Sequence, residues 1–245
     1  MLPDLTVEEL VAGLDWVAEN TLAGSGMTMP PVDAFQLARA LGITIVWDER
    51  QTCRARYVRL GGREGRKHRA VILLRPDPRP ERLHWAVAHE LGEHLAYRVF
   101  ERWQVEPCEL SAESREHTAN CLARRLLLPS RWFAVDGQSL GWDLWALKAR
   151  YHTASHELIA RRMLDFRTPI IISIFDNGRL HFRRCNFLHR PPLTPVERRC
   201  QRRVYNSGRP IRATFSQGFV QGWPVHEPGW KREILRLEVQ CSIDE

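Results

Sequence analysis

The spacing of apolar residues changes once along this chain, near residue 168, and this change limits the possible folds more than any other feature. Before it, apolar residues mostly recur three or four positions apart, the period of a helix, and short runs between residues 43 and 74 predict a small sheet. After Pro169, alternation at residues 170–184 and 235–241 predicts a hairpin and a final strand. We therefore predict an α+β protein. The predicted helices cover residues 7–17, 34–41, 81–100, 111–129, 144–151 and 155–166.

Composition excludes several classes of protein. The 245 residues are 44% hydrophobic and 27% charged, an ordinary globular balance with enough length for a sizeable core. The longest apolar run, residues 170–175, is far too short to span a bilayer, and the acidic start, residues 1–10, lacks the pattern of a secretory signal. Six cysteines without a CxxC pair argue against a disulfide framework and against a thiolate zinc site. We expect a soluble, cytoplasmic protein.

Basic residues exceed acidic ones by 36 to 29, and the excess is concentrated in residues 54–69 and 198–203. Arginine clusters without interleaved aromatic residues are weak signs of nucleic-acid binding, so we interpret both mainly as solvated faces. A weak nucleic-acid contact through these basic patches stays open, whereas a membrane partner is not expected.

Residues 89–94 read H-E-L-G-E-H within an apolar helical segment and resemble a zincin motif. In that chemistry two neutral imidazoles from one helix and a carboxylate from a second helix hold Zn²⁺, while water takes the open position. The glutamate after the first histidine takes the proton of this water and passes it to the leaving amine. Glu90 is therefore the predicted general base and acid.

The motif departs from the usual HExxH spacing, because the fourth position after His89 is Glu93 and the second histidine, His94, comes fifth. At about 100° per residue, a four-residue step separates side chains by about 40° around a helix, whereas a five-residue step separates them by about 140°. A regular helix thus pairs His89 with Glu93. A one-residue bulge, a device often found at functional sites, would bring His94 to the same face instead.

The surroundings of the motif resemble the ImmA/IrrE family of metallo-endopeptidases over about residues 30–166. Family members read H-E-L-G-H-L where this chain reads H-E-L-G-E-H-L, which looks like a one-residue insertion that preserves the histidine. The resemblance implies a zincin-like fold and places Glu116 in the third-ligand position. The matching stretches are V-D-A-F-Q-L-A-R-A-L-G-I ending at Ile43, residues 69–74 followed by R-P-E-R-L-H-W-A-V-A-H-E-L-G, E-H-T-A-N-C-L-A-R-R-L-L-L-P at residues 116–129, and residues 144–163.

Ligand chemistry favours His94 over Glu93. Two imidazoles and one carboxylate leave a zinc site net positive, whereas two carboxylates would cancel its charge and raise the pKa of the bound water. Gly92, next to the insertion, permits the distorted backbone that a bulge needs. We predict His89, His94 and Glu116 as zinc ligands, with Glu93 as the alternative to His94. Glu113 and His117 are nearby alternatives to Glu116.

The resemblance implies a zinc-dependent endopeptidase that cleaves a helix-turn-helix repressor of the Xre type and so relieves transcriptional repression, for example under stress. The alternative is a non-catalytic protein of zincin fold that regulates by binding a repressor or nucleic acid. Three regions are predicted. They are a zincin-like metallopeptidase core at residues 1–129, a helix-turn-helix-like extension at 130–168 and a β-rich region of unknown role at 169–245.

Overall fold

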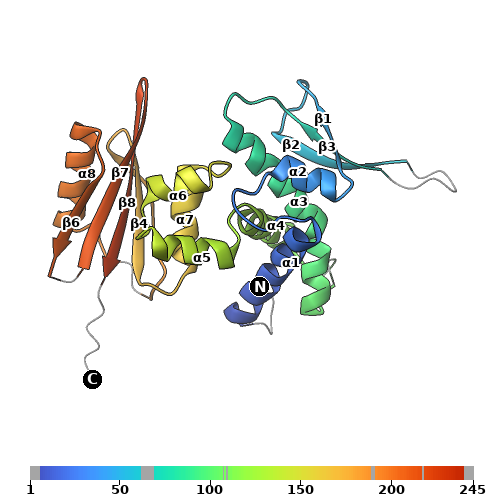
Figure 1. Cartoon of the computed structure of the whole chain (residues 1–245), viewed down its shortest axis with the longest axis horizontal. Coiled ribbons are helices and arrows are strands. Elements are labelled where there is room, and N and C mark those ends of the chain that lie inside the picture. Colours follow the sequence, from blue (N-terminus) through green and yellow to red (C-terminus); the bar gives the residue numbers. More distant parts are fainter. Residues whose placement is uncertain are drawn as a thin grey trace. The chain divides into compact units, whose positions relative to one another are not determined.

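The protein was studied as a computed structural model that describes residues 6–61, 69–106, 108, 110–188, 191–216 and 218–239. Three parts of the sequence discussed above lie outside this set: residues 1–5 of the acidic start, residues 62–68 of the first basic stretch, and residues 240–241 of the predicted final strand. The chain divides into two compact units (Figure 1). The first unit comprises Met1–Val135 and Arg150–Ser155, and the second comprises Asp136–Ala149 and His156–Glu245. The three-part division given above stays a prediction.

The first unit combines a small mixed sheet with long helices. Its sheet has the order β1-β3-β2, with β1 parallel and β2 antiparallel to β3. The strand β2 is thus an edge strand. The elements of this unit are α1 (Val7–Gly24), α2 (Ala34–Ala40), β1 (Thr44–Trp47), β2 (Ala55–Leu60), β3 (Arg69–Leu74), α3 (Pro80–Trp103), α4 (Ala112–Leu127) and the start of α5 (Ser130–Ser139).

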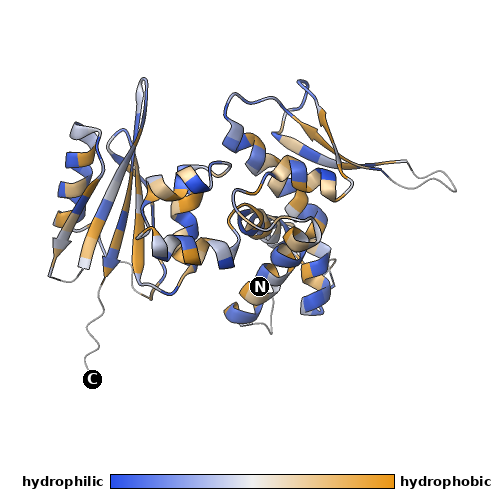
Figure 2. Cartoon of the chain, in the orientation of Figure 1, coloured by the Kyte–Doolittle hydropathy of each residue, from blue (hydrophilic) through white to orange (hydrophobic). Residues whose placement is uncertain are grey.

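Local signals in the sequence explain where these helices begin. Thr6 and Glu9 form a capping box before α1, and Ser111 accepts a hydrogen bond from the backbone of the first turn of α4. Pro80 occupies the first turn of α3, where its missing N–H removes no helical hydrogen bond. Hydrophobic and hydrophilic residues alternate along the helices and strands (Figure 2). Leu91 on α3 and Leu122 on α4 are fully buried.

Gly92 is essential to the packing of α3 against α4. A Cβ atom at this position would lie 2.3 Å from the backbone oxygen of Ala119, so only glycine lets the two helices approach this closely. The prediction gave Gly92 a different role, that of permitting a bulge. In the structure α3 is a regular α-helix through residues 89–94.

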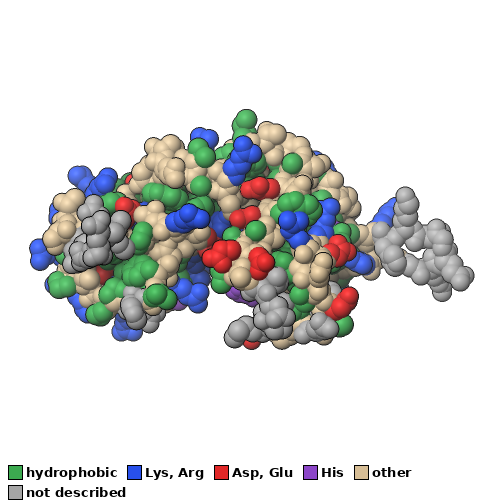
Figure 3. All heavy atoms as spheres, turned by 90° about the horizontal axis from the view of Figure 1, so that it is seen from below, with side chains coloured by type: hydrophobic (Ala, Val, Ile, Leu, Met, Phe, Trp, Pro, Cys, Tyr) green, Lys and Arg blue, Asp and Glu red, His purple; other side chains and the backbone are tan. Residues whose placement is uncertain are grey.

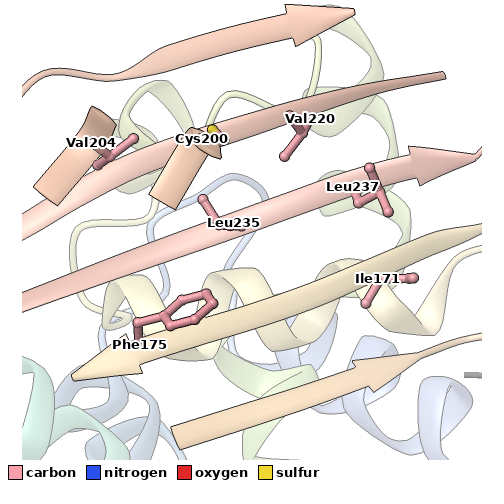
Figure 4. Close-up of a cluster of buried hydrophobic side chains, with 7 residues drawn as sticks. All are labelled: Ile171, Phe175, Cys200, Val204, Val220, Leu235 and Leu237. Carbon is pink, nitrogen blue, oxygen red and sulfur yellow. The ribbon is translucent and has the colours of Figure 1, made fainter. Parts of the chain in front are cut away.

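The second unit is built on a five-stranded antiparallel sheet of order β5-β4-β8-β7-β6. Helix α8 packs on one face of this sheet. Its side chains Cys200 and Val204 form a buried cluster with Phe175, Val220 and Leu235 of the strands (Figure 4). The predicted hairpin is present, with Asn177 and Gly178 at positive φ in its turn. The elements are α6 (Leu144–Arg150), α7 (His156–Arg162), β4 (Ile170–Asp176), β5 (Arg179–Cys185), α8 (Pro195–Ser207), β6 (Ile211–Phe215), β7 (Gly218–Glu227) and β8 (Trp230–Val239).

The α+β prediction is therefore confirmed, with a small sheet beside the motif helix and a β-rich C-terminal part. Within the described part of the chain, no helix has the length and apolar character needed to cross a membrane.

Candidate functional site

The motif helix and the following helix bring three candidate ligands together. His89 and Glu93 lie four residues apart on α3, and Glu116 faces them from α4. The Nε2 atom of His89 lies 3.6 Å from Glu93 Oε1 and 3.6 Å from Glu116 Oε2. One ligand atom from each of the three residues lies within 4.8 Å of the other two. This grouping has the size and the donor types of a metal site.

Asn120 holds two members of this cluster in place. Its Oδ1 atom lies 3.1 Å from His89 Nδ1, and its Nδ2 atom donates to Glu116 Oε1 at 3.0 Å. An amide oxygen can only accept, so His89 must carry its proton on Nδ1. In the neutral ring Nε2 then turns its lone pair toward the carboxylates, the tautomer that a metal ligand needs. Asn120 was not among the predicted site residues, although its place four residues after Glu116 on one helix face signals such a contact.

Glu90 lies beside the cluster and is buried, with 6% of its surface exposed. The backbone N–H of Tyr57, on edge strand β2, donates to Glu90 Oε2 at 2.7 Å. Burial raises the pKa of the Glu90 carboxyl, and the nearby Glu93 carboxylate raises it further, while the Tyr57 hydrogen bond opposes the rise. Glu90 therefore has the environment of a general base with a pKa shifted toward neutral.

His94 is not part of this cluster. Its Nδ1 atom lies 2.9 Å from the hydroxyl of Tyr57, and the two rings are 5.2 Å apart. Tyr57 thus binds Glu90 through its backbone and His94 through its side chain, and so joins β2 to α3. Burial lowers the pKa of His94, and the charges of Arg59 and Arg98 lower it further. The ring has a protein partner of its own, at a place that sequence spacing could not reveal.

The charges of the cluster are unbalanced. The contact with Glu93 raises the pKa of His89 in spite of the burial of the ring, and the same contact lowers the pKa of Glu93. In the described residues no lysine or arginine forms an ion pair with Glu90, Glu93 or Glu116. Two carboxylates therefore contact one imidazole, and a third, Glu90, acts on it through its charge.

An open pocket of about 270 Å³ gives access to the cluster. It is lined by parts of β2 and the segment before it, α3 and α4. The two predicted alternatives to Glu116 are not part of the cluster. Glu113 is absent from it, and His117 Nε2 lies 3.4 Å from Cys121 Sγ instead. The lining residues are Cys53, Arg54, Ala55, Trp85, Ala86, His89, Glu90, Glu116 and Asn120.

Comparison with known proteins agrees with the resemblance read from the sequence. Residues 48–164 match the Peptidase M78 family model, described as the IrrE N-terminal-like domain. Among solved structures, a Mycobacterium tuberculosis transcriptional regulator is similar in fold, with a TM-score of 0.63 and 21% sequence identity. The similarity covers 93% of this chain and 75% of that chain. A search of curated proteins finds no match.

Proposed function

We propose that this chain, whose residues 48–164 match the Peptidase M78 family model of the IrrE N-terminal-like domain, is a zinc-dependent endopeptidase with His89, Glu93 and Glu116 as its metal ligands. The family itself supports a metallopeptidase-like role. The observation that carries the proposal is the convergence of two carboxylates, Glu93 and Glu116, on the His89 imidazole, without an arginine or lysine among the described residues to balance them. Such a group needs a cation, because buried or crowded carboxylates repel one another.

The residues fit a divalent ion. Zinc accepts imidazole nitrogen and carboxylate oxygen, and three protein ligands leave a position open for chemistry. Asn120 acts as the partner that fixes the ring and one carboxylate, which is a regular feature of metal sites. Two carboxylates and one imidazole make a harder donor set than two imidazoles and one carboxylate. Manganese and iron(II) therefore belong in any binding experiment beside zinc.

Three observations support Glu93 over His94 as the third ligand. The regular helix places Glu93, not His94, on the face of His89, as the four-residue spacing requires. His94 already pairs with Tyr57. A bulge would also move Gly92, whose close approach to Ala119 holds α3 against α4. The proposal therefore departs from the set favoured on ligand chemistry alone.

When bound, the ion supplies a Lewis acid that polarises the scissile carbonyl and lowers the pKa of water. Glu90 accepts the proton of the attacking water and delivers it to the leaving amine nitrogen. The Tyr57 N–H orients the Glu90 carboxylate, and the Tyr57 hydroxyl contact with His94 keeps β2 in place beside it. Burial of Glu90 raises its affinity for the proton that it must carry.

We propose a helix-turn-helix repressor as the protein substrate. The family and the fold similarity to a transcriptional regulator support a place in gene regulation. A second function, regulation by binding a repressor without cleavage, is favoured by one observation. The donor set has two carboxylates, which would neutralise the charge of a divalent ion and weaken its effect on water.

Incubation with a purified helix-turn-helix repressor of the Xre type tests the proposal. The zinc-loaded protein should produce one or two discrete fragments, and a chelator should stop the reaction. The variant His117→Ala is a control that should cleave as the wild type does, because His117 lies next to Glu116 in sequence yet outside the cluster. Tight repressor binding without any cleavage would support the second function, and equal hydrolysis of casein would argue for a general peptidase.

A further inference from the structure

Helix α8 carries four arginines on its exposed side. Glu197, Cys200, Gln201 and Val204 are its buried residues, and they face the sheet. At about 100° per residue, the positions between them point to the opposite side of the helix. All the residues at these positions, which we call the α8 arginine face, are exposed: Arg198, Arg199, Arg202 and Arg203. In Figure 3, Lys and Arg side chains also lie around the rim of the C-terminal part, at the left.

No carboxylate balances the α8 arginine face. The only acidic residue of the helix, Glu197, is fully buried and forms an ion pair with Arg183. Among the ion pairs of the described residues, none includes an arginine of this face. Solvated helix faces usually mix both signs of charge, so four positive charges within two turns are not explained by solubility.

The arginines do not stabilise their own helix. Arg198 and Arg202, like Arg199 and Arg203, are four residues apart, where like charges destabilise a helix by roughly 0.2 to 0.5 kcal/mol per pair. Arg198 also lies near the helix N-terminus, where a positive charge opposes the helix dipole. The Thr194–Glu197 capping box and the Gly208 cap hold the helix in spite of this. The charge is therefore available to an anionic partner.

We propose that the α8 arginine face binds the phosphate backbone of double-stranded DNA. Arginine forks pair well with phosphate oxygens. Single-stranded nucleic acid is less suitable, because it needs exposed aromatic rings for stacking. The one aromatic residue of α8, Tyr205, packs against His226 and Lys231. An anionic membrane is also less suitable, because the apolar side of α8 is buried in the sheet and cannot enter lipid.

The contact is expected to be independent of base sequence, because it reaches only phosphates. Neutralising four phosphates gives a slope of about −3.6 in a plot of log binding constant against log salt concentration. This proposal does not depend on the peptidase function, since it needs neither metal nor cleavage.

Fluorescence anisotropy of the full chain with a labelled duplex, measured from 20 to 200 mM salt, tests it. The variant R198Q/R199Q/R202Q/R203Q should bind on the order of tenfold or more weakly and lose most of that slope. The matched control R39Q/R50Q/R75Q/R131Q removes the same charge from exposed arginines of the first unit and should stay within threefold. Circular dichroism should show the same helix content in both variants, and removal of repulsion should leave the melting temperature of the α8 variant equal or higher.

Three results would overturn the proposal. The first is no duplex binding by the wild type at 20 mM salt. The second is an equal loss in both quadruple variants, which would mean that only net charge matters. The third is tighter binding to oligo-dT or to phosphatidylserine vesicles than to the duplex.

Discussion

Two groups of carboxylates, one in each unit, have opposite surroundings. In the C-terminal unit, Glu197 accepts hydrogen bonds from two nitrogens of Arg183, and Asp176 accepts hydrogen bonds from two nitrogens of Arg232. In the N-terminal unit, Glu93 and Glu116 contact one histidine, Glu90 acts on it through its charge, and no arginine or lysine of the described residues pairs with these carboxylates. In the first arrangement each carboxylate charge is balanced by an arginine, whereas in the second the carboxylate charges are not balanced. Incompleteness of this kind distinguishes a functional site from a structural ion pair.

The pKa directions repeat this contrast. The Arg232 hydrogen bonds lower the pKa of Asp176, whereas burial and the Glu93 carboxylate raise the pKa of Glu90. A carboxylate with a lowered pKa stabilises the fold, and one with a raised pKa is suited to proton transfer.

The largest effect is expected for Glu90→Gln. Loss of a general base typically lowers kcat by about 10² to 10⁴, while metal content should stay stoichiometric because Glu90 is not a proposed ligand. Repressor cleavage and metal analysis measure the two quantities. Glu113→Gln, an exposed glutamate on α4, is the control and should retain activity. Loss of metal together with activity in Glu90→Gln would contradict the role given to this residue.

The next largest effect is expected for Arg183→Met, and it is an effect on stability instead of on activity. It leaves the fully buried Glu197 carboxylate without its cation, with only the Thr194 hydrogen bonds remaining among the described residues, which should lower the free energy of unfolding by about 3 to 5 kcal/mol. Urea denaturation measures it. Arg184→Met is the control, because Arg184 is the neighbouring exposed residue of the same strand. It should change the free energy of unfolding by less than about 1 kcal/mol. Equal effects of the two substitutions would mean that the Arg183–Glu197 pair does not stabilise the C-terminal unit, and would contradict the contrast with the carboxylates around His89.

A smaller effect is expected for Asn120→Ala. Removing the group that orients His89 and Glu116 should weaken metal affinity by about 10- to 100-fold without removing a ligand. Calorimetric titration with zinc measures it. Asn206→Ala, at an exposed position of α8, should bind metal as the wild type does. Unchanged affinity in Asn120→Ala would mean that the cluster does not rely on this contact.

The smallest effect is expected for Asp176→Asn. The folded-state pKa of Asp176 lies below its ordinary value of 3.8, so its stabilising contribution is present above that value and is lost as the pH falls below it. At pH 7 the substitution should lower the unfolding free energy by about 1 to 2 kcal/mol, since the pair is partly exposed. The difference from wild type should shrink between pH 4 and pH 2. A difference that grew on acidification would reverse the sign of the proposed linkage.

Much of the fold followed from local pattern, and the failures have physical causes. Helix α8 was not predicted, because Glu197 and Gln201 are polar residues on its buried side and break the apolar period. Strand β7 was not predicted, because it contains Gly222 and Pro224, which usually interrupt strands. A Cβ at position 222 would lie 2.9 Å from Cys200 Sγ and 2.9 Å from a Val204 methyl carbon, so glycine lets α8 pack on the sheet.

The site was only partly predictable. The motif predicted His89 and Glu90, and the family resemblance predicted Glu116. His94 was predicted as the remaining ligand, with Glu93 as its alternative. The choice depends on Tyr57, which contacts His94 from a strand 37 residues away in sequence. A long-range contact of this kind has no local signal. The role of Asn120 was missed for a different reason, since its contact with Glu116 is local but its contact with His89 is not.

Metal titration of the apo protein with zinc tests most directly the claim that an incomplete carboxylate cluster binds an ion. The account predicts one equivalent bound by the wild type, a sharp loss of affinity in Glu93→Gln and in Glu116→Gln, and affinity within a few fold of wild type in His94→Ala. Loss of binding in His94→Ala with retention in Glu93→Gln would place His94 on the metal. Absence of binding to zinc, manganese or iron(II) by the wild type would contradict the claim itself.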